Sequence, residues 1–245
     1  MIRRRTQPND PANPIPRISA ARGGACSVSH IAQDSSVGDA FEVAARFAAL
    51  AMDSRHLSET ETAELDAALS NVSDPRVQAV ALGALIRGTD RGHAVRAWTN
   101  AAQSSVIAVR RRAAELAPQL GALKPEPLIA LIADPDGLVA EAACWAGGEI
   151  AWEGASRALM VSALIGAASH DDPLVRESAV AALGAIGDGA GLDAILAACT
   201  DRPTVRRRAV LALAPFEGSA VEAALLAAGQ DSDWQTRQAA EDLMR

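Results

Sequence analysis

Two arginine triplets are the residues of this 245-residue chain best suited to hold a charged ligand. Arg110–Arg112 and Arg206–Arg208 each place three guanidinium groups in succession, and guanidinium binds phosphate or carboxylate oxygens through paired hydrogen bonds. Phosphate contacts of this kind would serve nucleic-acid binding. However, Glu141 and Glu177 occupy the equivalent position between the triplets and would repel a phosphate backbone. This mixture of charges favours a protein or peptide ligand over nucleic acid.

Tryptophan supplies the second group of candidates. Trp145 has two possible roles, as a core side chain or as an exposed aromatic that anchors a partner. Trp98 and Trp152 are expected to pack in the core, and Trp234 to cap its open end. Together with the charged residues, Trp145 completes the predicted partner-binding set, which is Arg111, Glu141, Trp145, Glu177 and Arg207.

Catalytic and metal-binding patterns are missing from the sequence. The four histidines are scattered, no His-Glu pair or H-E-x-x-H occurs, and there is no P-loop, G-x-S-x-G or Gly-rich dinucleotide motif. The three cysteines are far apart without a Cys-x-x-Cys, which favours reduced thiols in a cytoplasm. We therefore expect no catalytic residue, no cofactor and no metal, and we take the chain as a non-enzyme.

Charge is distributed unevenly along the chain. Residues 1–38 carry five Arg and two Asp, a net charge of +3, so the total of −7 leaves −10 on the remainder. An acidic body argues against general affinity for nucleic acid or anionic membrane, and no apolar run is long enough to cross a bilayer. Residues 1–38 are rich in Pro, Gly and Ser without helical or strand periodicity, so a disordered tail is predicted there.

Helical periodicity begins at Asp39. Phe41, Ala44, Ala45, Ala48 and Leu50 share one face of a predicted amphipathic helix. Next along the chain, Ser58 and Glu61 have the spacing of a capping box, in which each side chain bonds a free backbone amide of the other residue. A helix over about 59–70 is therefore predicted.

A repeat of 30 to 36 residues organises the rest of the chain. It is anchored by a β-branched residue, and an alanine follows four positions after each of the six anchors. Aspartate precedes four anchors by three residues, where it would cap a helix, and proline follows it or its equivalent in three repeats, at the first helical position. The anchors are Val77, Val109, Val139, Val175, Val205 and Thr236, and the alanines are Ala81, Ala113, Ala143, Ala179, Ala209 and Ala240.

These columns predict a helix that buries its anchor and lets a neighbouring helix approach over the alanine. A second apolar-periodic segment precedes each such helix, so the unit is an antiparallel helix pair. One pair cannot bury its own apolar stripe, whereas a stack of pairs can. The predicted fold is all-α, a right-handed α-solenoid of about six helical hairpins over residues 39–245 with one extra N-terminal helix.

The segment 172–184, which reads D-x-x-V-R-x-x-A-x-x-A-L-G, resembles the HEAT repeat, especially the short bacterial form seen in phycobilisome lyases. The resemblance spans roughly 74–245 and departs from the pattern at Val106, which replaces the cap Asp, and at Ala140, which replaces Arg. It implies that the second helix of each pair lines a concave surface. HEAT-like proteins include scaffolds, transport adaptors and a few enzymes, so the resemblance implies fold more strongly than function.

One arginine column follows the anchors, at Arg110, Arg176, Arg206 and Arg237. We expect a structural ladder to carboxylates or carbonyls of the adjacent turn, such as Asp172, Asp201 or Asp231, with anion binding as the alternative.

The resulting functional hypothesis is a non-catalytic, cytoplasmic scaffold or adaptor that holds a protein or peptide partner on the concave face. Two alternatives stay open, a bilin-lyase-like accessory protein and nucleic-acid binding through the two Arg triplets. The sequence does not specify the oligomeric state.

Overall fold

The computed structural model describes residues 31–53 and 55–245, with side-chain environments from residue 39 onward, and everything below refers to these residues. The chain divides into two units, Met1–Val37 and Gly38–Arg245, and the second contains all six predicted repeats. The tail predicted over residues 1–38 lies outside the described residues as far as residue 30. Its predicted disorder therefore stays a prediction.

The described residues are all-α, with no strand. After α1 (Ile31–Met52) come six antiparallel pairs, each with a first and a second helix, as predicted. The first helices are α2 (Glu59–Asn71), α4 (Arg91–Ala102), α6 (Glu126–Ile132), α8 (Gly154–Ala167), α10 (Leu192–Ala198) and α12 (Ser219–Ala228). The second helices are α3 (Pro75–Gly88), α5 (Ile107–Leu116), α7 (Gly137–Glu149), α9 (Pro173–Ile186), α11 (Pro203–Ala212) and α13 (Trp234–Leu243). Short 3₁₀ turns follow α5 (Ala117–Leu120) and α9 (Gly189–Gly191).

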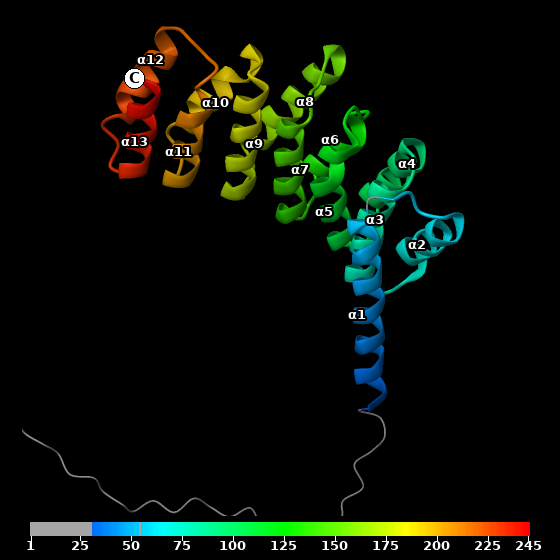
Figure 1. Cartoon of the computed structure of the whole chain (residues 1–245). Coiled ribbons are helices and arrows are strands. Elements are labelled where there is room, and N and C mark those ends of the chain that lie inside the picture. The colour runs from blue at the N-terminus through cyan, green and yellow to red at the C-terminus, as the bar shows by residue number, and fades with distance from the viewer. Residues whose placement is uncertain (1–30, 54) are drawn as a thin grey trace, which may run out of the picture. The chain divides into compact units, whose positions relative to one another are not determined.

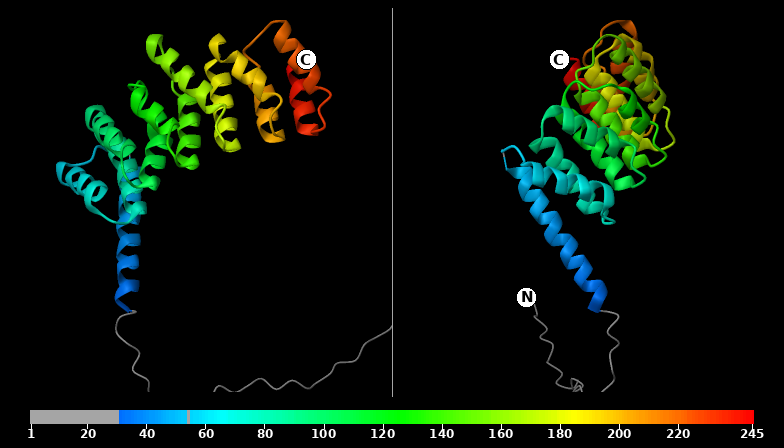
Figure 2. Two further views of the ribbon diagram at one scale, coloured as in Figure 1. Left: turned by 180° about the vertical axis from the view of Figure 1, so that it is seen from behind. Right: turned by 90° about the vertical axis from the view of Figure 1, so that its right-hand side faces the viewer.

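Within residues 38–245 the helices form two rows, the arrangement of an α-solenoid. The second helices stand side by side along the concave side of the stack, and the first helices form the outer row (Figures 1 and 2). Each second helix packs against the second helices of the repeats before and after it. The stack therefore presents one continuous inner surface built from α3, α5, α7, α9, α11 and α13.

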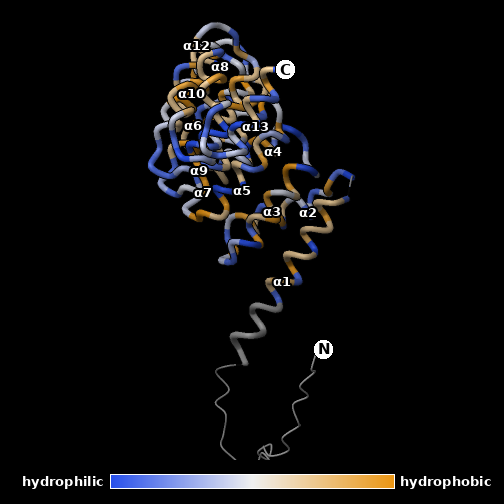
Figure 3. The backbone as a smooth tube through the Cα atoms, turned by 90° about the vertical axis from the view of Figure 1, so that its left-hand side faces the viewer, coloured by the Kyte–Doolittle hydropathy of each residue, from blue (hydrophilic) through white to orange (hydrophobic). Residues whose placement is uncertain are grey.

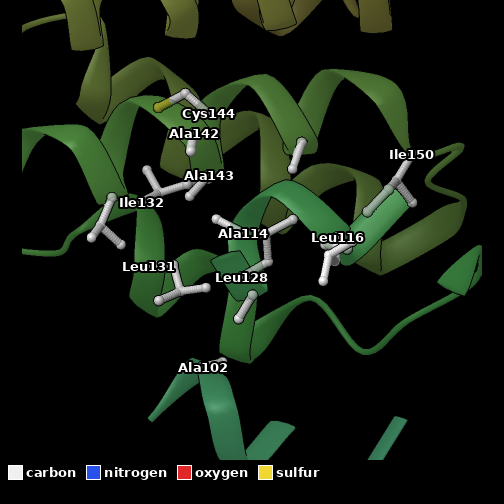
Figure 4. Packing of buried hydrophobic residues seen from close by; sticks show 14 of the residues in the cluster. Ala102, Ala114, Leu116, Leu128, Leu131, Ile132, Ala142, Ala143, Cys144 and Ile150 are labelled. Atoms are coloured by element: carbon white, nitrogen blue, oxygen red, sulfur yellow. The ribbon is translucent and has the colours of Figure 1, made fainter. Parts of the chain in front are cut away.

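The anchor and alanine columns form the core of the stack. All six anchors are at most 1% exposed, and the six alanines that follow them are 0% exposed. Around α5, α6 and α7 the core is filled by Leu116, Leu128, Leu131 and Ile132 from neighbouring helices (Figure 4). Along the backbone, hydrophobic helical stretches alternate with hydrophilic stretches (Figure 3). Stacking thus buries the stripe that a single hairpin leaves exposed.

Local signals set where the helices begin. Asp74, Asp136, Asp172 and Asp233 each accept a backbone N–H at the start of α3, α7, α9 and α13. As predicted, α2 begins with a capping box, in which the Ser58 hydroxyl and the Glu61 carboxylate each accept a backbone N–H. Helix α5 begins without a side-chain cap, because Val106 has no acceptor to offer.

Helix α1 differs from the prediction in its start and in its buried face. It begins at Ile31, eight residues before Asp39. Phe47 is its buried aromatic at 1% exposure, whereas Phe41 is 70% exposed, so the stripe chosen from sequence was wrong at its aromatic residue. Ala44 and Leu50 of the predicted stripe do pack against the core, together with Val43. Two stripes of similar apolar content lie along this Ala-rich helix, and contact with its neighbours selects between them.

Glycine permits the closest approaches between second helices. A Cβ on Gly148 of α7 would lie 2.8 Å from Cα of Ala182 on α9. A Cβ on Gly184 of α9 would lie 2.7 Å from Cα of Ala212 on α11. Both distances are far below normal carbon–carbon contact, so only glycine allows these two backbones to pack at this spacing.

Candidate binding surface on the inner helices

The helical register defines which side chains face away from the core along the concave side. Relative to each anchor, the positions −1, +2, +6 and +10 lie opposite the buried anchor and alanine on a 3.6-residue helix. We call these positions, in all six second helices, the inner face. In α7 they are Leu138, Glu141, Trp145 and Glu149.

Four large apolar side chains of the inner face are exposed to solvent. Leu138 and Trp145 on α7 are 50% and 44% exposed, Leu174 on α9 is 54% exposed, and Leu211 on α11 is 42% exposed. Leu138 and Leu174 occupy the same register position in adjacent repeats, and Trp145 and Leu211 share another. On α9, the helix between them, Ala181 occupies the same position as Trp145 and Leu211, and its small side chain projects little from the surface. The repeats therefore align an apolar strip across α7, α9 and α11.

The five residues predicted from sequence all occupy inner-face positions. Arg111 forms an ion pair within α5, with 3.2 Å between its Nε and Oε1 of Glu115. Glu177 on α9 pairs with Arg208 on α11, with 3.5 Å between Oε1 and Nη2. Arg207 donates a hydrogen bond to the side-chain oxygen of Gln235 on α13. The predicted set is thus distributed over four adjacent second helices, and three of its members make polar contacts with residues outside the set.

Trp145 and Glu141 complete the set from α7. The exposure of Trp145 rules out its role as a buried core residue. Glu141 has no ion pair within 4.0 Å among the described residues, and its backbone carbonyl accepts a hydrogen bond of 2.9 Å from the hydroxyl of Ser178. These five residues stay a prediction as a binding set, because the structure contains no partner.

The other tryptophans divide into buried and exposed. Trp98 and Trp152 are 1% and 7% exposed, and each indole N–H donates to a backbone carbonyl at 2.8 Å, of Ala113 and of Gly147 respectively. They are packing residues, as expected. The prediction for Trp234 was wrong, because it is 64% exposed and covers no core.

The arginine column that follows the anchors forms a structural ladder. The Arg110 guanidinium donates Nε and Nη2 to the two oxygens of Asp134 at 2.6 and 3.0 Å. Arg176 binds Asp201 in the same two-pronged way at 2.6 and 2.7 Å, and Arg206 binds Asp231 at 2.8 and 2.7 Å. In each case the aspartate belongs to the loop of the following repeat.

Arg237 completes this column by donating to two backbone carbonyls, and Asp172 has no hydrogen bond to the ladder. The ladder lowers the pKa of the Asp201 and Asp231 carboxyls through hydrogen bonds from Arg176 and Arg206. Its guanidiniums are therefore committed to joining repeats, and we assign them no role in ligand binding.

No metal-holding cluster assembles among the described residues. No three His, Cys, Asp or Glu side chains there are arranged to hold a metal ion. Cys144 and Cys199 are free thiols, and burial raises their pKa values to about 12 and about 11. Thiols of such high pKa stay protonated at neutral pH and are poor nucleophiles.

The best-formed cavities lie away from the apolar strip. A cavity of about 450 Å³ between α2 and α4 is lined by His56, Asp66, Asp90 and His93, with 3.1 Å between Nε2 of His93 and Oδ1 of Asp66. Another, of about 340 Å³, is lined by apolar residues of α6 and α8 in the outer row. A third, of about 440 Å³, is lined in part by the inner-face residues Glu149 and Ala185. The four residues of the apolar strip line none of these three cavities, and an exposed surface suits a long ligand better than an enclosed small molecule.

Sequence reasoning missed Leu138, Leu174, Leu211 and Glu149. All four fall in register columns that the anchors define, so a search for apolar or acidic residues at −1, +6 and +10 would have found them. No helix of the described residues combines the length and apolar character needed to span a membrane. A cytoplasmic location stays a prediction.

Comparison with known proteins agrees with this architecture. Residues 125–214 match the family model described as HEAT repeats. Among solved structures, the YibA protein of Escherichia coli has a TM-score of 0.58 at 15% identity, covering 91% of this chain and 77% of that one. A designed armadillo repeat protein, solved in complex with the peptide (KR)4, has a TM-score of 0.56 at 18% identity, covering 76% and 98%. An engineered protein gives 0.55 at 18% identity, covering 77% and 96%.

The chain is thus similar to HEAT-repeat proteins over residues 125–214, and its fold is an α-solenoid of the armadillo and HEAT type. Among curated proteins, none matches its sequence significantly. At identities below 20%, the likeness to the solved structures extends to the fold alone.

Proposed function

We propose that this protein is a non-catalytic scaffold that binds an extended segment of a protein or peptide partner along its inner face. The observation that carries the proposal is the apolar strip of Leu138, Trp145, Leu174 and Leu211, four large side chains that the fold leaves 42% to 54% exposed. They lie in two register rows on three consecutive second helices, and the charged row of Glu141, Glu177 and Arg207 lies between the two rows. Exposed apolar patches rimmed by polar residues are typical of interaction sites.

The charged frame of the strip supports a peptide rather than a nucleic acid. Arg111 and Arg207 are offset by Glu141 and Glu177, which lie on the two helices between them. Residues of both signs around an apolar centre are typical of protein interfaces, where the charges set orientation and the centre supplies affinity. Because α7, α9 and α11 are held by tight packing, the surface is preformed and little ordering opposes binding.

A designed relative supports the choice of ligand class. The armadillo repeat protein described above has the same fold and is in complex with the peptide (KR)4. A protein of this fold can therefore bind a peptide, and we extend that ligand class, though not that sequence, to this chain.

Peptide selection tests this proposal directly. The full chain would be immobilised and challenged with a displayed library of random linear peptides. Variant Trp145→Ala/Leu211→Ser removes the centre of the strip, and Leu159→Ser serves as a matched control because Leu159 is 49% exposed on the outer helix α8.

We expect selected peptides to bind the wild type and the Leu159→Ser protein equally. Loss of Trp145 and Leu211 should weaken them by about a thousandfold, since hot-spot residues contribute about 2 kcal/mol or more each. If every selected peptide bound the double variant as well as the wild type, the inner face would not be the binding surface.

A further inference from the structure

The N-terminal end of the inner face carries a surplus of positive charge. Arg111 and Arg112 on α5 both pair with Glu115, at 3.2 and 3.0 Å. A Cβ placed on Gly83 of α3 would lie 3.5 Å from Nη2 of Arg112 and 3.6 Å from Nη1 of Arg87, so these guanidiniums from two helices converge over the glycine. Two of these guanidiniums thus share the single carboxylate of Glu115, and Arg87 has no ion pair among the described residues.

The convergence over Gly83 has a structural reason. The equivalent register position holds Glu115, Trp145 and Leu211 in other repeats, whereas glycine leaves a shallow, side-chain-free site on α3. Arginine side chains from α3 and α5 occupy its rim. A carboxylate or phosphate placed there would accept hydrogen bonds from Arg87, which has no ion pair among the described residues, and from Arg112, which shares Glu115 with Arg111.

The middle of the inner face has the opposite character. Glu141, Trp145 and Glu149 follow one another at four-residue intervals on α7 and so form one ridge. Neither glutamate has an ion pair within 4.0 Å among the described residues, and the indole between them is 44% exposed. A guanidinium or ammonium group stacked on Trp145 would gain a cation–π contact and lie within reach of two carboxylates.

The distance between these two places follows from helix packing. Helices α3 and α5 are neighbours, as are α5 and α7. Packed helices lie about 8–10 Å apart, so Gly83 and Trp145 are separated by about 20 Å. An extended chain advances about 3.3 Å per residue, and 20 Å corresponds to about six residues.

We propose that the inner face selects an extended peptide with an acidic side chain over Gly83 and a basic side chain on Trp145, about six residues apart. This inference rests on the proposed function and adds the chemistry of its partner. A uniformly basic peptide is disfavoured, because one end would meet the guanidiniums of Arg87, Arg111 and Arg112. A uniformly acidic one would meet Glu141 and Glu149 instead.

Synthetic peptides of fixed composition provide the test. Each fluorescein-labelled peptide would carry one Glu and one Arg on a neutral background, at separations of about two, about six and about ten residues, in both orders. Affinity for the full chain would be measured by fluorescence anisotropy at low ionic strength, where charge contacts are strongest. We expect the separation of about six residues to bind about tenfold more tightly than the others, in one of the two orders.

Charge reversal identifies the site. Arg112→Glu should lower the affinity of the best peptide by about tenfold, and a peptide with Lys in place of its Glu should recover it. Arg96→Glu on α4 is the matched control, because Arg96 is an exposed arginine outside the inner face, and it should leave binding unchanged.

Equal affinity at all three separations, or full binding by the Arg112→Glu protein, would overturn this inference. Neither result touches the proposed function, which fails only if peptides bind independently of Trp145 and Leu211.

Discussion

The joint between α9 and α11 and the joint between α7 and α9 hold neighbouring repeats together differently. In both, a glycine lets the second helices approach closely, Gly184 in the first and Gly148 in the second. The α9–α11 joint adds a charged clamp, in which Arg176 binds both oxygens of Asp201 and donates to the carbonyls of His170 and Asp171. Both clamp side chains are more than four-fifths buried, so this pair is shielded from solvent.

The α7–α9 joint lacks both the arginine and the aspartate of the clamp. Ala140, 0% exposed, replaces the arginine, and His170 stands where Asp134 and Asp231 stand in other loops. Nδ1 of His170 accepts the N–H of Asp172 at 3.0 Å, as Oδ1 of Asp134 accepts the N–H of Asp136 at 2.9 Å. The imidazole of His170 therefore accepts the hydrogen bond of the turn, as the aspartate does elsewhere, but supplies no carboxylate for an arginine to bind. Close packing alone is enough to join these two repeats.

The largest expected effect comes from breaking a clamp. Arg176→Ala leaves the Asp201 carboxylate largely buried without a counter-charge and removes donors from two carbonyls, so the free energy of unfolding should fall by about 3 kcal/mol. Urea denaturation measures this, with Arg96→Ala on the surface of α4 as the control. A variant as stable as the wild type would mean that the clamp adds nothing to packing.

The next largest effect is expected at the glycine contact of the α7–α9 joint. Gly148→Ala places a methyl group 2.8 Å from Cα of Ala182, so the helices must separate, and we expect a loss of about 2 kcal/mol in the free energy of unfolding. Gly166→Ala on α8 is the matched control, because no atom lies within 4 Å of its added Cβ. That control should be as stable as the wild type or more stable by up to about 1 kcal/mol. Equal free energies of unfolding for Gly148→Ala and Gly166→Ala would contradict a close approach at Gly148.

Acid should weaken the charged clamps. Hydrogen bonds from Arg206 lower the pKa of Asp231 to about 2 in the folded protein, below its ordinary value of 3.8. A lowered folded-state pKa means that the stabilisation is complete above the ordinary value and is lost as the pH falls toward 2. Between pH 5 and pH 2, the free energy of unfolding from urea denaturation should therefore fall by about 1–2 kcal/mol more in the wild type than in Asp231→Asn. Parallel pH profiles would argue against a charged clamp.

The smallest effect tests whether a clamp can be restored. Ala140→Arg combined with His170→Asp recreates at α7–α9 the pair found at the α5–α7, α9–α11 and α11–α13 joints. Each single change should destabilise the protein, since the introduced arginine alone crowds a buried site and the introduced aspartate alone lacks its partner. A double-mutant cycle should show a favourable coupling of about 1 kcal/mol. The control pair is Ala140→Arg with His170→Asn, which supplies no charge and should show little coupling. A coupling free energy of zero for both pairs would mean that the aspartate in this loop does not reach the introduced arginine.

Much of the fold could be predicted from sequence because its determinants are local. Aspartate caps, first-turn prolines and the anchor–alanine spacing act within one helix, and all six anchors and alanines are buried as expected. The same reasoning failed where two alternatives were locally equivalent. Phe41 and Phe47 lie on competing stripes of α1, and only contact with the core selects Phe47. Trp234 has a hydrophobic side chain, yet its position at the start of α13 leaves it in solvent.

The candidate site was predicted in part for a related reason. Charged residues of a single column, such as Arg111 and Glu141, were recognised because the repeat gives them equivalent positions. Leu174 and Leu211 were missed because each is unremarkable within its own helix. They become a strip only when adjacent repeats bring them beside Leu138 and Trp145.

The sequence by itself determined the repeating unit, the starts of most helices and the identity of the buried columns, since these depend on hydrogen bonds and periodicity within about 30 residues. The tertiary structure alone decided which loop carboxylate each ladder arginine reaches, where glycine brings two backbones together and which exposed side chains form one surface. Those features join residues of different repeats, and their distances depend on how the repeats stack rather than on the pattern within any one of them.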